Sequence, residues 1–545
     1  MKRPGTLASV LIVATAIAAY ASTANNYFIQ DDFGVVWLLS QKPATYFPQW
    51  FVSAWMDQIW GFTPDEVRPF PAVSYQIAAI FGAAAPFANH AINIGFHAGT
   101  SLLVAQVARH AAGLAIPAAT VAALLFVLLP NQGETVAWIT GRVDSLPAFF
   151  YVASFLAYVR WRAGHGTRFY GWSLVWCFVA LFSKQTAITL GPALVLYDLI
   201  VGRHRVEVTW RWLRPYVPFA ALTLGYLALR YVLFGEVARE GTLTATRFYV
   251  FLQDATNHLL RIVFGAQTTG GPGGRAVAIA GAAFLIGLIA RSMRATDISR
   301  PRGDARAAFY FGVVWVALGI LPTLVSTYSS PRHAYLASLG WAIVAGVAFN
   351  RLWEVRTVRV ARIAAAIGMS ALLAAYVIQL RTVVIDWNRR AAISQKAVAD
   401  LERVVNDAPD GSLIVAGMSP AVWAFSLPFA AEPPFSRTNL TSRVLMIWPA
   451  PDHCCGVFQW DTYTRERLRT WLSNAAHPPA IVLSWNADSG ALTRLSDDAD
   501  PSLKTLIGLL DASGDRVALE TNLDRLVEDY APYHGAAIRE PAARR

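Results

Sequence analysis

Long apolar runs alternate with short polar segments over the first 380 residues of the chain. We expect membrane spans at residues 7–24, 87–109, 114–130, 145–160, 169–182, 187–201, 215–234, 276–290, 308–325, 334–350 and 363–380. Crossing the hydrocarbon core of a bilayer takes about 20 predominantly apolar residues of helix. The pattern therefore predicts a polytopic α-helical membrane protein with about eleven spans.

The arginines mark one side of this predicted bundle. They gather between the apolar runs, at 160–168, 203–214, 291–306 and 351–362. Because cytoplasmic loops carry an excess of Lys and Arg, we expect these segments to face the cytoplasm. The N-terminus is then also cytoplasmic, whether residues 1–21 remain as an anchor, which we favour, or form a cleavable signal peptide.

One long loop separates the first two predicted spans. Residues 25–86 are rich in Trp and Tyr, which favour the level of the lipid headgroups, and their apolar run 70–82 is too short to cross hydrocarbon. The arginine pattern places this loop outside the cytoplasm.

The stretch 235–275 is ambiguous. Its run 248–264 is apolar enough to resemble a span, but it contains Asp254, His258 and Arg261. We interpret it as an external amphipathic helix, because a span there would place the arginines of the following loop on the wrong side of the membrane.

The composition changes after the last apolar run. Residues 386–407 carry a helical stripe of apolar positions, and 413–416 and 480–485 read as strands. These features predict an extracytoplasmic α/β domain over 381–545, after a membrane domain over 1–380. Its sequence shows no nucleotide-binding glycine motif and no nucleophile elbow, so we assign it no chemistry.

Composition supports the membrane interpretation. Hydrophobic residues make up 55% of the chain and charged residues only 15%, and the mean hydropathy is +0.39. These values exclude an ordinary soluble enzyme. The net charge of +11 is explained by the predicted cytoplasmic loops, so we expect no nucleic-acid partner. Three cysteines without Cys/His spacing predict neither a disulfide framework nor a zinc site.

The first candidate chemistry is an acidic pair at the start of the external loop. Asp31 and Asp32 follow the first apolar run within Asn25-Asn26-Tyr27-Phe28-Ile29-Gln30-Asp31-Asp32-Phe33. A carboxylate beside a membrane span needs either open water or a function. A solvated loop and a catalytic pair are both compatible with this position.

Cations occur at the predicted external ends of several spans. Arg142 lies between the third and fourth spans, Lys184 between the fifth and sixth, and Arg332 with His333 before the tenth. Because external cations oppose the positive-inside bias, they need anionic company. They either pair with acids of the protein or bind a phosphate whose lipid tail lies in the bilayer.

In combination, these features resemble the GT-C glycosyltransferases, especially the protein O-mannosyltransferases and the membrane part of the TMTC proteins. The resemblance covers roughly residues 7–395. It is carried by Asp31-Asp32, Arg68-Pro69-Phe70, His90, Asn93 and His97, Glu134 with Gly141-Arg142-Val143-Asp144, Ser183-Lys184, Arg332-His333-Ala334-Tyr335, and Asp386-Trp387-Asn388. It implies transfer of a sugar from a polyprenyl-phosphate carrier on the external face, with a first-loop acid at the reaction centre.

The chain departs from this family at three points. Pro130-Asn131-Gln132-Gly133 stands where relatives have His-Pro-x-His, so any role of those histidines is absent. Gln185 stands where relatives often carry Glu, which leaves Lys184 freer for a ligand. No tetratricopeptide period follows residue 395, so we expect acceptor recognition to differ.

His90, Asn93 and His97 share one predicted helix face, since they are spaced i, i+3 and i+7. Polar side chains between spans commonly hydrogen-bond to neighbouring helices. We favour that interpretation over ligand contact, although the second remains open.

Together these features predict an inverting, metal-independent displacement. One carboxylate, Asp31 before Asp32, removes the proton of an acceptor hydroxyl or amine while cations stabilise the departing lipid phosphate. The donor-phosphate or substrate-binding candidates are Lys184, Arg332, His333, Arg142, Arg68, Tyr335 and His97. Two adjacent Asp side chains diverge in regular structure, so we expect no metal or other cofactor.

The expected partners are membrane lipid, a polyprenyl-phosphate sugar, and a glycan, glycolipid or protein acceptor. The Ala- and Arg-rich composition favours a bacterial inner membrane, with the C-terminus outside the cytoplasm. The alternative function is a non-catalytic binder or transporter of lipid-linked glycans.

Overall fold

The computed structural model describes residues 4–56, 66–82, 85–202, 209–237, 245–265, 305–325, 330–354, 359–417, 427–447 and 470–495 without 475, 477 and 479, together with 504 and 508. The predicted span 276–290, the arginines of 291–302 and the adjacent cysteines Cys454 and Cys455 lie outside the described residues. Contacts divide the chain into a membrane unit (1–24, 66–71 and 90–386) and a second unit (25–65, 72–89 and 387–545). The second unit thus joins most of the first loop to the C-terminal part.

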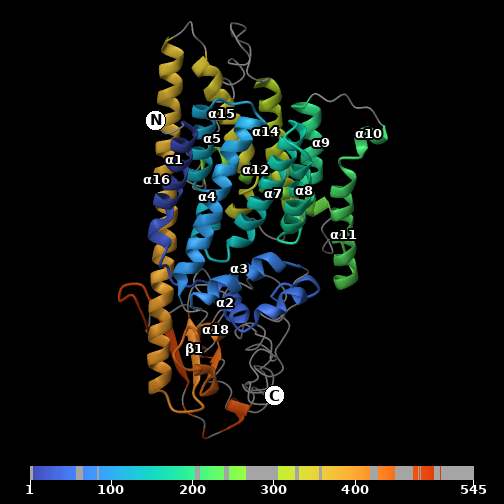
Figure 1. Cartoon of the computed structure of the whole chain (residues 1–545). Helices are drawn as coiled ribbons and strands as arrows, with labels where there is room; N and C mark the ends of the chain where they lie inside the picture. Colours follow the sequence, from blue (N-terminus) through green and yellow to red (C-terminus); the bar gives the residue numbers. More distant parts are fainter. Residues whose placement is uncertain are drawn as a thin grey trace. The chain divides into compact units, whose positions relative to one another are not determined.

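The membrane unit is a bundle of helices (Figure 1). Its helices are α1 (Pro4–Tyr20), α4 (Pro86–His110), α5 (Ile116–Leu128), α6 (Gln132–Ala137), α7 (Arg142–Arg162), α8 (Thr167–Leu181), α9 (Leu190–Ile200), α10 (Trp210–Leu213), α11 (Val217–Phe234), α12 (Ala245–Phe264), α14 (Ala305–Ile320), α15 (Ser338–Glu354) and the first part of α16 (Arg359–Asp407). Short 3₁₀ segments η1 (Ala21–Thr23), η3 (Gln185–Thr189), η4 (Leu321–Val325) and η5 (Pro331–Ala334) follow or precede them.

Within the described residues, five helices are long and apolar enough to cross a membrane. They are Gly5–Thr23, Pro86–His110, Val217–Phe234, Ala305–Leu324 and Arg362–Asp407, and Ile116–Leu128 and Gln185–Ile200 are shorter apolar helices. These results confirm transmembrane helices, while the number of eleven stays a prediction. The predicted amphipathic stretch forms α12, which is not among the five.

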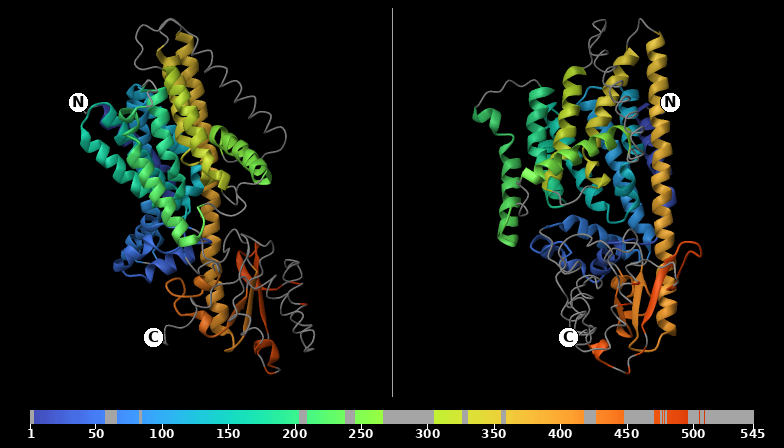
Figure 2. Two further views of the ribbon diagram at one scale, coloured as in Figure 1. Left: turned by 90° about the vertical axis from the view of Figure 1, so that its right-hand side faces the viewer. Right: turned by 180° about the vertical axis from the view of Figure 1, so that it is seen from behind.

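Aromatic packing and close helix contact build the core of the bundle. Phe155 of α7 packs edge-on against Trp315 of α14, with ring centroids 4.9 Å apart. Helices α14 and α15 run side by side (Figures 1 and 2). A Cβ placed on Gly312 of α14 would lie 2.9 Å from the carbonyl oxygen of Gly340 in α15, so only glycine permits this approach. Segment η4 follows α14 and η5 precedes α15, so this close contact positions both segments. Segment η5 carries residues of the site described below.

A buried polar cluster joins α7, α9 and the residue that precedes α11. Asp198 of α9 accepts hydrogen bonds from the hydroxyls of Tyr158 in α7 (2.5 Å) and Tyr216 before α11 (2.6 Å). Arg162 of α7 forms an ion pair with the same carboxylate. Because Asp198 is fully buried, these donors and this cation compensate its charge.

The second unit combines short helices with a sheet. It contains α2 (Asp32–Ser40), η2 (Ala44–Phe51), most of α3 (Pro69–Ile80), the C-terminal part of α16, α18 (Leu427–Ala430) and η6 (Leu440–Ser442). The sheet has the order β2-β1-β3-β4, formed by β2 (Leu445–Ile447), β1 (Leu413–Gly417), β3 (Ile481–Asn486) and β4 (Ala491–Arg494).

Strand β1 pairs in parallel with both neighbours, and β3 and β4 are antiparallel (Figure 2). Leu413 lies opposite Leu445, and Ile414 opposite Ile481. Helix α16 is fastened to β4, because the N–H of Leu492 donates to Asp400 Oδ2 at 3.0 Å. Strands occur where the sequence predicted them, whereas the extent of a C-terminal domain over 381–545 stays a prediction.

Candidate functional site

The polar turn between α6 and α7 supplies the acids of the site. The turn is tight at Gly141, where a Cβ would lie 2.6 Å from the carbonyl oxygen of Thr135, so a side chain does not fit. It places Glu134 in α6 and Asp144 in the first turn of α7. Asp144 is buried.

Cations from two distant segments meet these acids. Lys184, in the turn after α8, forms an ion pair with Asp144. Arg332 of η5 lies 2.8 Å from Glu134 Oε1 through Nη1 and 3.3 Å from Asp144 Oδ2 through Nε. The hydroxyl of Ser330 donates to Glu134 at 2.5 Å. Two cations and two carboxylates therefore balance, and we call Glu134, Asp144, Lys184 and Arg332 the charge cluster.

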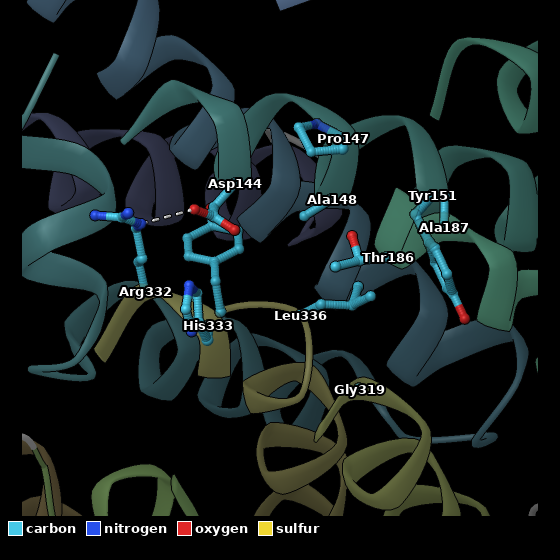
Figure 3. A pocket seen from close by; sticks show the side chains of 11 residues that line it. Asp144, Pro147, Ala148, Tyr151, Thr186, Ala187, Gly319, Arg332, His333 and Leu336 are labelled. Carbon is cyan, nitrogen blue, oxygen red and sulfur yellow. Dashed lines mark ion pairs between the residues drawn. The ribbon is translucent and has the colours of Figure 1, made fainter. Parts of the chain in front are cut away.

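A pocket opens beside the charge cluster. It is lined by Asp144, Pro147, Ala148, Tyr151, Thr186, Ala187, Gly319, Arg332, His333, Tyr335 and Leu336. Figure 3 shows Arg332, Asp144 and His333 at one end, and Tyr151 and Ala187 at the other. One end of the pocket is thus charged, and the other is mostly apolar.

Burial and mutual repulsion shift the basic groups. Burial lowers the pKa of Lys184 below its usual value; Asp144 partly offsets this effect, and Arg68 and Arg332 reinforce it. Burial also lowers the pKa of His333 well below its usual value, and the charges of Lys184 and Arg332 act in the same direction. His333 is therefore a neutral imidazole at neutral pH, able to donate or accept a hydrogen bond.

Lys184 pairs with a distant acid, since the next residue in this chain is Gln185 and not Glu. Gln185 instead donates to Glu66 at 3.3 Å, and Glu66 pairs with Arg68 at 2.7 Å. Asp144, 40 residues earlier in the chain, takes the place of the local acid. The charge of Lys184 is thus compensated within the protein by Asp144.

Arg142 is tied to α4. Its Nε donates to Asn93 Oδ1 at 2.7 Å, and Asn93 Nδ2 donates to the carbonyl of Trp138 at 2.8 Å. Arg142 is fully buried. The ring of Trp138 also lies under the guanidinium of Arg332, 4.7 Å away, so Trp138 links Arg142 to the charge cluster.

His97 and Tyr335 form an interhelical contact. His97 Nδ1 lies 2.9 Å from the Tyr335 hydroxyl, and Nε2 lies 3.2 Å from the carbonyl oxygen of Val127. Since a carbonyl only accepts, Nε2 carries the proton and Nδ1 accepts from Tyr335. Both ring nitrogens are used within the fold, which favours the interhelical interpretation of His97 over ligand contact.

His258 lies near the charge cluster, although the sequence pattern predicted no role for it. His258 of α12 is fully buried, and its ring centroid lies 6.3 Å from that of His333. Among the residues that the structure describes, neither ring nitrogen of His258 has a hydrogen-bond partner. Burial, reinforced by Arg261, lowers its pKa to about 4. The sequence carries only a weak signal, because His258 is one of several polar residues of this amphipathic helix, among them Asp254 and Arg261.

Asp31 and Asp32 belong to the second unit, and they differ in their surroundings. Asp32 is buried; its Oδ2 accepts the N–H of Ile29 at 3.0 Å, and its own N–H donates to the Ile29 carbonyl at 3.1 Å. Between them Gln30 has a φ of 55°, a left-handed conformation that is uncommon for residues other than glycine. We call Ile29 to Asp32 the acidic turn. Asp31, partly exposed, caps α2 with its backbone.

In the described part of the chain, no three His, Cys, Asp or Glu side chains are grouped as metal ligands.

No protein-family model matches the chain. Among curated proteins it is 28% identical over 227 residues to the human protein O-mannosyl-transferase TMTC4, a match that covers 36% of this chain and 30% of the relative. It is 24% identical over 211 residues to human TMTC3, covering 35% of this chain and 22% of the relative. The chain spans less than a third of the length of these relatives.

Among solved structures, the crystal structure of ArnT from Cupriavidus metallidurans bound to undecaprenyl phosphate is similar with a TM-score of 0.50 and 15% identity, over 88% of this chain and 93% of that chain. This identity supports a common fold and nothing finer. The suspected resemblance is confirmed: the chain is related in sequence to the TMTC protein O-mannosyl-transferases and has the fold of the GT-C membrane glycosyltransferases.

Proposed function

We propose that the protein is an integral-membrane glycosyltransferase that moves a sugar from a polyprenyl-phosphate carrier to an extracytoplasmic acceptor. The observation that carries the proposal is the fold shared with ArnT, whose crystal structure holds undecaprenyl phosphate, in a chain whose sequence relatives are protein O-mannosyl-transferases. The acceptor is a glycan, a glycolipid or a protein.

The charge cluster and its pocket support a phosphate-binding role. Lys184 and Arg332 supply a point charge and a fork of donors, and neutral His333 lies beside them. Asp144 and Glu134 hold these cations in place. A phosphate at the charged end of the pocket would interact with Lys184 and Arg332 alongside the two carboxylates. Both cations are already in position, so donor binding would not require either of them to move.

The acidic turn supports Asp31 as the general base. Asp32 already holds the backbone of Ile29 with its carboxylate, which leaves it the task of positioning. In the proposed step the acceptor oxygen or nitrogen forms a bond to the anomeric carbon as the bond from that carbon to the phosphate oxygen breaks. Asp31 takes the acceptor proton, and the phosphate leaves with the electron pair, stabilised by the cations. A monophosphate leaving group needs less neutralisation than a diphosphate, so the proposed step uses no metal.

The test is to incubate the purified protein with a panel of polyprenyl-phosphate sugars and follow the release of free polyprenyl phosphate. Release with one donor, dependent on an acceptor, is expected. Binding of a donor without release for every member of the panel would overturn the proposal in favour of a binder or transporter of lipid-linked glycans.

Replacing Lys184 with Ala is expected to weaken donor binding about 10- to 100-fold, because a charge-assisted hydrogen bond to phosphate is worth about 1.5–3 kcal/mol. Binding of a polyprenyl-phosphate analogue to the folded variant measures this. Arg332→Ala should behave alike, and Arg168→Ala, which removes an exposed cation of the same unit, is the matched control. Unchanged donor affinity in both cluster variants would remove them from the donor site.

We further propose a bacterial inner membrane with a cytoplasmic N-terminus and an external C-terminus, on the arginine pattern of the loops. A reporter that is active only outside the cytoplasm should be active when fused after Arg545. Activity there of a reporter that functions only in the cytoplasm would contradict this orientation.

A further inference from the structure

The acidic turn is held by segments that follow it by more than 350 residues. From α16, the hydroxyl of Ser394 donates to the Phe28 carbonyl at 2.7 Å across 366 residues. Asn388 Oδ1, also in α16, accepts from Asn26 Nδ2 at 2.9 Å. The backbone immediately before the turn is therefore fixed to this helix.

A second contact comes from the segment after α18. The ring of Phe435 lies edge-on to both Phe28 and Phe33, with centroids 4.9 Å away in each case. Phe28 and Phe33 flank the acidic turn in the sequence, and both are fully buried. Phe435 thus packs on the apolar side chain at each end of the acidic turn.

Phe435 is itself anchored on α16. Glu402 Oε1 accepts hydrogen bonds from the N–H of Arg437 at 3.1 Å and from the hydroxyl of Ser436 at 3.3 Å. In addition, Phe429 of α18 packs on Trp37 of α2, with ring centroids 5.4 Å apart. An unbroken series of contacts therefore runs from α16 through residues 429–437 to both sides of the acidic turn.

We propose that residues 427–437, through Phe435, act as a brace that positions the general base. This inference rests on the proposed function of Asp31 and gives the C-terminal part of the chain a role in catalysis. Gln30 holds a left-handed conformation within the turn, which persists only where its surroundings determine it. A general base must lie within hydrogen-bond reach of the acceptor. The rate of the reaction therefore falls steeply when the loop that carries the base is displaced. Phe435 is thus a positioning residue.

The experiment compares Phe435→Ala with Phe435→Tyr, which keeps the ring, and with Leu492→Ala, which removes a buried side chain of β4. Phe435→Ala is expected to lower kcat by about 10- to 100-fold while the donor affinity stays unchanged. Phe435→Tyr should restore kcat to within about threefold, and Leu492→Ala should leave kcat within about threefold of the parent.

Hydrogen exchange gives a readout that does not depend on activity. Peptides covering residues 27–40 should exchange faster in Phe435→Ala, because Phe435 packs on Phe28 and Phe33 at the two sides of the acidic turn. They should not exchange faster in Leu492→Ala, because Leu492 lies in β4. Unchanged exchange would overturn the brace whatever the activity. Faster exchange with an unchanged kcat would overturn its role in positioning. If the parent protein releases no polyprenyl phosphate from any donor, the proposed function is wrong, and the role of Phe435 in positioning a base is wrong as well. The exchange data report separately whether the brace contacts the segment around the acidic turn.

Discussion

Replacing Asp31 with Asn is expected to lower turnover by about 10²- to 10⁴-fold, the usual contribution of a general base. Asn has the same shape but cannot accept the acceptor's proton. The rate of polyprenyl phosphate release under single-turnover conditions measures the loss, and donor binding should stay near the parental level.

Asp32 provides the matched control for this experiment. Its carboxylate accepts the N–H of Ile29, and the amide oxygen of Asn can accept the same bond. Asp32→Asn should therefore keep most of the activity, whereas Asp32→Ala should lose more by releasing the turn. If well-folded Asp31→Asn and Asp32→Asn variants both turned over at the parental rate, the catalytic interpretation of this turn would have to be abandoned.

Replacing Asp144 with Ala is expected to cost about 3–5 kcal/mol of the free energy of unfolding, the range for breaking a buried ion pair. Lys184 is buried beside it, and Arg332 would keep only Glu134 of the two carboxylates. An uncompensated buried ammonium is the main cost. Denaturant titration in mixed micelles, followed by far-UV circular dichroism, measures the change.

A double variant separates charge from packing. Asp144→Leu combined with Lys184→Leu removes both charges and keeps apolar volume, a change that is often neutral for stability. It should recover most of the lost free energy of unfolding while donor binding stays weak. A loss below about 1 kcal/mol in Asp144→Ala would show that the pair is screened as a surface ion pair is, contrary to its burial.

The sequence predicted the helices well where apolar length decides the outcome. Helices α4 and α11 lie within a few residues of their predicted spans, because a long apolar run has one solution in a bilayer. The sequence pattern also predicted that Lys184 and Arg332 need anionic partners, either acids of the protein or a lipid phosphate. It did not name their partners, since the Arg332–Glu134 contact joins residues 198 positions apart through the packing of α14 on α15.

The backbone conformation of the loops could not be predicted from the sequence in the same way. The residues around Gln30 do not predict its left-handed backbone conformation. This conformation depends on the hydrogen bonds between Asp32 and the backbone of Ile29 and on contacts from α16. The shared helix face of Asn93 and His97 was predictable from spacing. The hydroxyl that His97 meets, on Tyr335, was not, because it comes from a segment 238 residues later.

The distance in sequence between the acidic turn and its brace affects the order of events during synthesis. Tyr27 and Phe435, whose hydroxyl and carbonyl lie 3.5 Å apart, are separated by 408 residues. At about 5–20 residues per second, a ribosome needs on the order of 20–80 s to make the intervening chain. A nascent chain, or one truncated before residue 435, would thus insert its first spans with the base still unbraced. On the proposed function, such a chain would transfer sugar more slowly than the complete protein.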